Sequence, residues 1–435
     1  MTPHEPASSR SSRAPSPKPS VERRPAPGAI VLCALLVAAC GSPPRAAEPA
    51  SPERAGAPPP PATRAPEPEA AAATASPPTP PPRSPTPEPL SLGAPKLLHV
   101  LRHEGDIFSL AFDPTGQWIA TGCADKRVRL WSTVAGKLRH TFKDHRDAVS
   151  SVAFRPDGGE LASGSFDGTA KTWDPKTGKR VATVVGPEGG VVSVAYSKDG
   201  RRLAMGGANG HIVVADLGDE TARIELAGHG GSVRSVAFAR AHDWLLSRAD
   251  DGLLLVWDLT TTKPIVKVPL STGAVWSARF TTNDASLVTT WENADGATVG
   301  SWDAGTGKLV RALPVGSSLA PSIALSADDR LLAVGTAEGH VKLWDFPRGE
   351  RLFDLAPFRK NVSALGVSPD GHYVAAGGPD DLLDVWELGV PGSARAAEPA
   401  DKKDRAACLA ECRHRNAYAD CADESGMVAC PCRCD

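Results

Sequence analysis

The sequence is poor in several features that mark whole classes of protein. Aromatic residues make up only 5% of the 435 residues, no long run of Lys or Arg occurs, and the formal net charge is −2. Nucleic-acid binding needs clustered positive charge to displace counterions, so the composition argues against a nucleic-acid partner. No Gly-x-Ser-x-Gly motif occurs, which excludes the nucleophile elbow of that class of serine hydrolases. A protein or peptide partner fits this composition better.

Proline is concentrated at the start of the chain. Of the 41 prolines, 26 lie in the first 95 residues, among Ala, Ser, Glu and Arg. Such a segment cannot bury enough apolar surface to offset its chain entropy. We therefore expect residues 40–95 to form a disordered, partly polyproline-II tether that extends over on the order of 100 Å.

A short apolar run, Ile30–Ala39, precedes this tether and follows Arg23 and Arg24. The run is too short to span a bilayer, which takes about 20 apolar residues. It has the length of a signal-peptide core. The closing residues, Val37-Ala38-Ala39-Cys40, resemble the lipobox of bacterial lipoproteins. The resemblance implies a signal peptide over residues 1–39 and a lipid on Cys40.

This resemblance further implies a protein of the bacterial cell envelope that is held to the membrane through its lipid anchor only. Gly41, rather than Asp, follows the cysteine, which favours the outer membrane. An ordinary cleaved signal or a chance apolar stretch is the alternative.

Seven similar units follow one another between residues 96 and 388. Each contains Trp followed by Asp, or a variant of this pair, and successive pairs stand 42 residues apart except for one interval of 45. The pairs are Trp131-Ser132, Trp173-Asp174, Ala215-Asp216, Trp257-Asp258, Trp302-Asp303, Trp344-Asp345 and Trp386-Glu387. A fixed period of this length is the signature of a repeat architecture.

Each unit is predicted to form four short strands. In the second unit, the alternating run Val149–Phe154 predicts a strand, Arg155-Pro156-Asp157-Gly158 a turn, and Leu161–Gly164 a second strand. Asp167-Gly168 then turns the chain into a third strand that ends at Trp173, and a fourth follows. Four such strands make one propeller blade. The sequence therefore predicts an all-β, seven-bladed β-propeller over residues 96–388.

The units resemble the WD-repeat family. In that family a His, a Ser or Thr, an Asp and the Trp form a hydrogen-bonded set within a blade, which we call the blade lock. The resemblance implies three complete blade locks: His103, Thr121, Asp125 and Trp131; His145, Ser163, Asp167 and Trp173; and His229, Ser247, Asp251 and Trp257.

The same residue types could form a nucleophilic triad. A trio that recurs at one spacing in separate blades is, however, typical of a structural element. We expect no catalytic residue, no cofactor and no metal site in this chain.

Four units lack the lock histidine. Its position is taken by Pro187, Ser271, Gly316 and Phe358. We expect blades three, five, six and seven to be held less firmly, by roughly 1 kcal/mol for each buried hydrogen bond not made.

The seventh unit lacks a fourth strand, because the chain runs from Trp386 almost directly into Gly389-Val390-Pro391-Gly392. Lys96–Arg102 reads as a strand of the fourth type that precedes the first unit. We expect this strand to complete blade seven, close the ring and cover the exposed edge.

The end of the chain is rich in cysteine. In the oxidising compartment that a signal peptide implies, an even set of close cysteines predicts a disulfide module over residues 407–435, after a linker over 389–406. The cysteines are Cys408, Cys412, Cys421, Cys430, Cys432 and Cys434. We favour pairing each of the last three with one of the first three; zinc, with His414 as a further ligand, is the alternative. Cys123 is expected to be a small buried side chain.

The most plausible function on this evidence is a monomeric, non-enzymatic scaffold that binds a protein or peptide. A structural envelope component and a propeller enzyme are the alternatives. The expected binding face carries Phe108, Arg234 and Trp276 near the starts of inner strands, and Trp291 in a blade-five insertion expected to form a loop. Aromatic residues and Arg dominate protein interfaces. The aromatic candidates could instead pack between blades.

Overall fold

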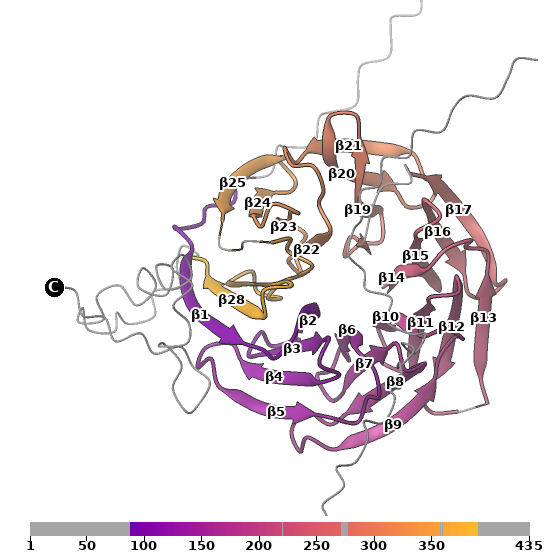
Figure 1. Cartoon of the computed structure of the whole chain (residues 1–435). Coiled ribbons are helices and arrows are strands. Elements are labelled where there is room, and N and C mark those ends of the chain that lie inside the picture. Colours follow the sequence, from indigo (N-terminus) through magenta and orange to yellow (C-terminus); the bar gives the residue numbers. More distant parts are fainter. Residues whose placement is uncertain (1–87, 220, 271–276, 357, 359, 390–435) are drawn as a thin grey trace, which may run out of the picture. The chain divides into compact units, whose positions relative to one another are not determined.

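The computed structural model describes residues 88–389, except 220, 271–276, 357 and 359. The described residues form 28 strands and no helix. The strands make seven four-stranded antiparallel sheets, which surround a common axis as the blades of a seven-bladed β-propeller (Figure 1). The all-β fold and the number of blades predicted from the repeats are confirmed.

Each blade takes its strands in chain order from the axis outward. Blade one consists of β2 (Ile107–Phe112), β3 (Trp118–Cys123), β4 (Val128–Ser132) and β5 (Leu138–Phe142). Blade two consists of β6 (Val149–Phe154), β7 (Leu161–Ser165), β8 (Thr169–Trp173) and β9 (Arg180–Val185). Blade three consists of β10 (Val191–Tyr196), β11 (Arg202–Gly207), β12 (His211–Asp216) and β13 (Arg223–Ala227). Blade four consists of β14 (Val233–Phe238), β15 (Trp244–Ala249), β16 (Leu253–Asp258) and β17 (Lys263–Pro269).

The remaining blades follow the same order. Blade five consists of β18 (Ala278–Phe280), β19 (Ser286–Asn293), β20 (Gly296–Asp303) and β21 (Leu309–Pro314). Blade six consists of β22 (Ser322–Leu325), β23 (Leu331–Gly335), β24 (Val341–Asp345) and β25 (Glu350–Leu355). Blade seven consists of β26 (Ala364–Val367), β27 (Tyr373–Gly377), β28 (Leu382–Glu387) and β1 (Lys96–Arg102).

The ring closes through strand β1, which supplies the outer strand of blade seven. β1 pairs antiparallel with β28, from Lys96 opposite Glu387 to Arg102 opposite Leu382. The two strands come from opposite ends of the described chain and lie side by side in Figure 1. The predicted closure, with the same bounds for the strand, is confirmed.

The described region begins at residue 88, within the segment expected to be tether. Leu90 donates its backbone N–H to an Asp345 carboxylate oxygen at 2.7 Å, and Arg330 donates to the Glu88 carbonyl at 2.7 Å. Leu90 and Leu92 pack against the cluster of buried side chains between blades six and seven. Residues 88–93 therefore form a contact with the propeller that the proline-rich composition did not indicate.

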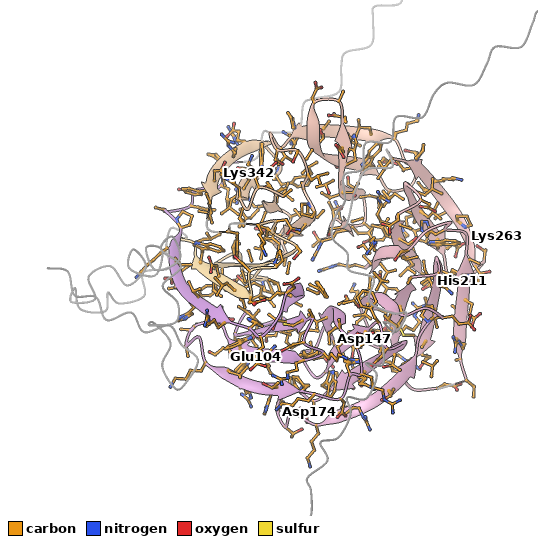
Figure 2. The ribbon with its side chains drawn as sticks, in the orientation of Figure 1. Glu104, Asp147, Asp174, His211, Lys263 and Lys342 are labelled. Atoms are coloured by element: carbon orange, nitrogen blue, oxygen red, sulfur yellow. The ribbon has the colours of Figure 1, made fainter. Side chains whose placement is uncertain are left out.

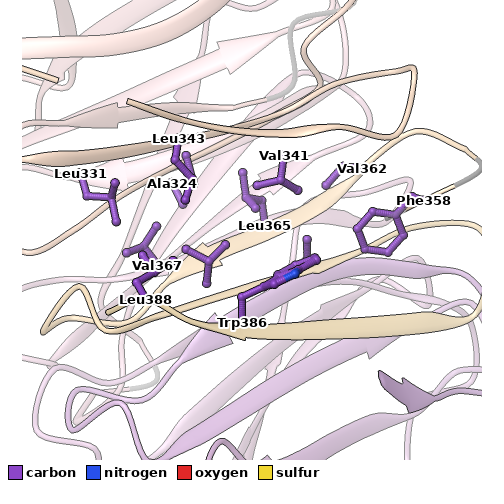
Figure 3. Close-up of a cluster of buried hydrophobic side chains, with 13 residues drawn as sticks. Ala324, Leu331, Val341, Leu343, Phe358, Val362, Leu365, Val367, Trp386 and Leu388 are labelled. Carbon is purple, nitrogen blue, oxygen red and sulfur yellow. The ribbon is translucent and has the colours of Figure 1, made fainter. Parts of the chain in front are cut away.

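Burial in the propeller is organised by the junctions between blades. Seven clusters of buried apolar side chains occur among the described residues, and each takes its members mainly from two adjacent blades. Figure 3 shows the cluster of blades six and seven, where Leu343 and Val341 face Leu365 and Val367, with Trp386 beside Phe358. The hydrophobic driving force thus holds blade to blade.

A hydroxyl side chain also bonds to the backbone of the next blade at every junction. Ser109 and Ser151 accept from the N–H of Val152 and Val194, each at 3.1 Å. Hydroxyls donate to backbone carbonyls at the other junctions, over 2.7–3.2 Å: Ser193 to Val233, Ser235 to Ala278, Thr290 to Ala320, Ser322 to Val362, and Ser363 to Ile107. This ring of bonds explains the repeated Ser of the inner strands, which the sequence patterns left without a role.

Candidate functional site

The alternation of strand direction gives the ring two faces with different loops. The loops that precede each inner strand and those that join second to third strands open on one side, which we call the top face. The loops from first to second and from third to fourth strands open on the other side, the bottom face. The partner-binding residues predicted from the sequence are expected on the top face.

The inner strands of blades one to four each carry an extra residue near the top face. Their pairing with the second strand skips one position, at Phe108, Ser150, Val192 and Arg234. An extra residue of this kind bends the strand and re-aims its own side chain. Two of these residues, Phe108 and Arg234, are sequence-predicted partner-binding candidates.

Two exposed phenylalanines lie toward the top face of blades one and two. Phe108 is 37% exposed and Phe166, in the turn after β7, is 40% exposed. The N–H of Phe166 bonds to the Ala148 carbonyl, which fixes its turn beside the entry to β6. Phe166 is not among the sequence-predicted candidates, although it precedes the lock residue Asp167, where blades one and three have Ala124 and Ala208. An aromatic residue at that turn position was the available signal.

Arg234 is half-buried and already has a partner. Its Nε and Nη2 atoms donate to the two carboxylate oxygens of Asp250, at 2.9 and 2.7 Å. Such paired bonds hold a guanidinium in a fixed plane. Arg234 therefore presents an oriented ion pair on blade four.

The insertion in blade five lengthens two strands. β19 and β20 pair from Ser286 opposite Asp303 up to Asn293 opposite Gly296, so the extra residues extend a hairpin where a loop was expected. Trp291 lies in β19, is half-buried, and its ring centroid is 5.4 Å from that of Trp302. This contact is within blade five. Trp276 lies outside the described residues.

Blades two and four contain the full set of lock bonds. In blade two, His145 Nδ1 lies 2.9 Å from an Asp167 oxygen and His145 Nε2 lies 2.8 Å from Ser163 Oγ, which also accepts Trp173 Nε1–H at 2.8 Å. Because a carboxylate only accepts, Nδ1 is the donor, and the serine hydroxyl donates to Nε2.

Blade four repeats this arrangement. His229 lies 3.0 Å from Asp251 and 2.7 Å from Ser247 Oγ, and Trp257 donates to the same hydroxyl at 2.7 Å.

The electrostatics of the locks fit a neutral histidine beside a charged aspartate. Burial lowers the pKa of His145 and His229 despite their carboxylate partners. Burial opposes ionisation of Asp167, but bonds from Thr169, the Arg146 N–H and His145 outweigh it and lower its pKa to about 2. The Ser163 side chain has no exposed surface. A substrate cannot reach this hydroxyl, so the trio acts as a structural lock.

Blade one has a different arrangement of the same residue types. His103 Nε2 lies 2.9 Å from Thr121 Oγ1, but Asp125 pairs with Arg129, and Trp131 Nε1 has no hydrogen-bond partner among the described residues. Burial, and then the charge of Arg129, lower the pKa of His103 to about 3. Arg129 lies in the third strand, two residues before Trp131. It takes the place of His103 as the partner of Asp125, which the spacing of the lock residues does not predict.

Blades without the lock histidine contain substitutes. In blade six, Lys342 donates to the carbonyls of Val315 and Gly316, at 2.8 and 3.1 Å, so its ammonium bonds where the histidine is missing; Figure 2 labels this residue. In blade seven, Phe358 packs edge-on against Trp386, with 6.3 Å between the ring centroids. Pro187 of blade three is buried, and Ser271 of blade five lies outside the described residues.

The remaining predicted features divide between the described and undescribed parts of the chain. Cys123 is fully buried, and burial raises the pKa of its thiol to about 12. Within residues 88–389, with the gaps given above, no group of three or more His, Cys, Asp or Glu is placed to hold a metal ion. The same part of the chain has no helix of the length and apolar character needed to cross a bilayer. Cys40 and the tail cysteines lie outside it: Cys408, Cys412, Cys421, Cys430, Cys432 and Cys434.

Comparison with known proteins finds the same repeat. The family model described as "WD domain, G-beta repeat" matches six segments that together exceed half of the chain, namely residues 95–132, 136–174, 178–216, 221–258, 309–345 and 351–387. These segments leave out residues 259–308, which include most of blade five.

Two curated proteins are similar over shorter stretches. The chain is 27% identical over 143 residues to cell division cycle 20.1, cofactor of APC complex, from Arabidopsis thaliana, an alignment that covers 32% of this chain and 31% of that protein. It is 40% identical over 65 residues to the guanine nucleotide-binding protein G(I)/G(S)/G(T) subunit beta-1 from Homarus americanus, covering 15% of this chain and 19% of that one. The chain thus spans about a third and a fifth of the lengths of these relatives.

Proposed function

We propose, since this chain belongs to the WD-repeat family, that it is a non-enzymatic scaffold whose propeller binds a protein or peptide partner on its top face. The observation that carries the proposal is the pair of exposed aromatics, Phe108 and Phe166, held by an inner strand and a tight turn. Rigid aromatic side chains supply much contact area at low entropic cost, and they are enriched at interface centres.

The names of the two relatives support a protein partner. One is called a cofactor of a complex and the other a subunit, so each name describes a component of an assembly. Buried blade locks and cross-blade hydroxyl bonds make the ring a rigid frame, and a preformed surface loses less entropy on binding. The same rigidity would serve a scaffold here.

The remaining candidates complete the proposed face. Arg234 with Asp250 adds an oriented ion pair on blade four. Trp291 has its ring partly covered by Trp302, and Trp276 belongs to the proposal on sequence grounds alone. We further propose that the protein is a monomer held at the outer membrane of the bacterial envelope by a lipid on Cys40.

The test is capture of a partner by the full chain from a bacterial envelope extract. The double variant Phe108→Ala with Phe166→Ala should retain its melting temperature, because both rings are exposed. Loss of an interface anchor typically costs 2 kcal/mol or more, so capture should weaken by roughly thirtyfold or more.

The matched control is Val181→Ala on the outer strand β9, where the valine is 55% exposed. This variant should capture the partner as the unchanged protein does. The proposal fails if the double variant captures equally well, or if the unchanged chain retains no defined partner.

A further inference from the structure

Charged side chains occur on the described inner strands of two adjacent blades only. The described residues of the seven inner strands include only two charged side chains, Arg234 and Arg279, on the adjacent blades four and five. Arg279 pairs with Val288 in the β18–β19 ladder. The residues at the same register position of the other blades are Ala111, Ala153, Ala195, Ala237, Ala324 and Gly366. Blade five thus places a long cation where every other blade has a minimal side chain.

The Arg279 side chain is exposed to solvent, although its strand is the innermost of the blade. A side chain on an inner strand can reach solvent only along the ring axis or at a face of the ring. Side chains from the surrounding blades extend toward this axis in Figure 2. Arg279 is therefore an exposed cation at the axis side of blade five.

The surroundings of Arg279 do not neutralise it. The protein around the guanidinium lowers its pKa by desolvation, and no carboxylate among the described residues acts in the opposite sense. Arg234, by contrast, has the Asp250 carboxylate at 2.7 Å. An exposed guanidinium with five donors and no carboxylate partner among the described residues is suited to an external anion, and a carboxylate matches its geometry.

We propose that Arg279 binds an acidic side chain of a peptide or protein segment that enters the ring along its axis. The inference rests on the proposed function, because it gives the chemistry of the partner that the propeller would hold. It concerns blade five, whose inner strand departs furthest from the repeat.

The experiment measures binding of a fluorescein-labelled hexaglutamate peptide to the full chain at low ionic strength by fluorescence anisotropy. Hexaglutamine is the neutral comparison peptide and should bind at least about tenfold more weakly. Arg279→Ala restores the residue found in five other blades, so folding should be kept, which the melting temperature checks. This variant should weaken hexaglutamate binding by roughly tenfold or more.

The control variant is Arg201→Ala, which removes an exposed arginine from the turn between β10 and β11 on the bottom face. It should bind hexaglutamate as the unchanged chain does. Equal weakening in both variants would show a general effect of charge and overturn the proposal, as would unchanged binding in Arg279→Ala. Displacement of the peptide by inorganic phosphate at the same anion concentration would show a site for small anions and also overturn it.

These outcomes are separable from the scaffold proposal. Hexaglutamate binding requires no natural partner, and capture from an extract requires no acidic peptide. If the chain captures a partner through the top face but does not bind hexaglutamate, the role of Arg279 is refuted and the scaffold proposal stands.

Discussion

Blades four and five are neighbours in the ring, but they follow the repeat to very different degrees. Blade four has a complete lock around Ser247, has its first three strands within a segment matched by the family model, and has an inner strand of six residues. Blade five lies mostly in the unmatched segment, has a described inner strand of three residues, and carries the long β19–β20 hairpin. Blade five therefore departs much further from the repeat than the blade beside it.

The junction between these two blades shows how a regular neighbour accommodates an irregular one. Arg248 of β15 is fully buried, at the register position that Gly122, Gly164 and Gly206 hold in blades one to three. A Cβ atom at Gly122 or Gly164 would come within 2.8 Å of a valine of the next blade. The presence of Arg at this position means that the junction of blades four and five is packed differently from the junctions that follow blades one to three. The residue that fits at this position therefore depends on the adjacent blade as well as on its own.

The largest test of the comparison uses the two repeat tryptophans. Trp257 is 1% exposed and bonded to Ser247, so Trp257→Ala should cost about 3 to 5 kcal/mol of unfolding free energy. Trp302 is half-buried and its Nε1 has no partner among the described residues, so Trp302→Ala should cost roughly 1 to 2 kcal/mol. Chemical denaturation measures both. Equal losses would break the contrast between the blades.

A smaller test uses acid. The pKa of His229 is lowered in the folded protein by burial, so the unfolded chain takes up a proton at higher pH than the folded one. The lock's stabilisation is therefore fully present above about pH 6.5, the ordinary histidine value, and declines as the pH falls below it, by at most about 1.4 kcal/mol per pH unit.

His229→Gln should thus reduce the slope of stability against pH between pH 7 and 5. This range lies above the pH at which the lock aspartates take up protons. Melting temperatures across this range measure the slope. An unchanged slope would mean that His229 is not held neutral in the fold.

The smallest expected effect concerns Trp291. Its ring is half-buried against Trp302, so Trp291→Ala should cost roughly 1 kcal/mol, well below the loss at Trp257. An exposed anchor, the role expected from the sequence, would instead leave melting nearly unchanged when lost and weaken capture. Melting and partner capture measured together on this variant decide whether Trp291 is a packing residue, an anchor, or both. A loss as large as that at Trp257 would remove it from the proposed face.

The sequence predicted most where one residue type recurs at one spacing. The seven blades and the closing strand Lys96–Arg102 follow from period and turn chemistry. The residues that meet in the locks of blades two and four follow from the resemblance to the WD-repeat family, matched at that period. The alternation of apolar residues fixes which side of a strand is buried, and a repeat applies that rule seven times.

Features made by side chains from different strands could not be predicted in the same way. Arg129 takes Asp125 from its lock, and Lys342 bonds at the place of a missing histidine, because long side chains reach atoms that spacing does not relate. The proline-rich composition does not predict the docking of residues 88–93, because only two leucines of this segment, Leu90 and Leu92, pack against the propeller. Phe166 and Arg279 were visible as departures from small residues at repeat positions, a comparison that needs the blades aligned at every register position.

The segment of residues 88–93 has a mechanical consequence. β1 begins beside the end of β28, so a pulling force applied at residue 88 would peel the closing strand away one pair at a time, starting with Lys96 and Glu387. Before that force reaches Lys96 it must break the bond from Leu90 to Asp345 and pull Leu90 and Leu92 out of the junction of blades six and seven. A chain held through its amino-terminal side would therefore pass tension into blades six and seven before the tension reaches the β1–β28 pairing that closes the ring.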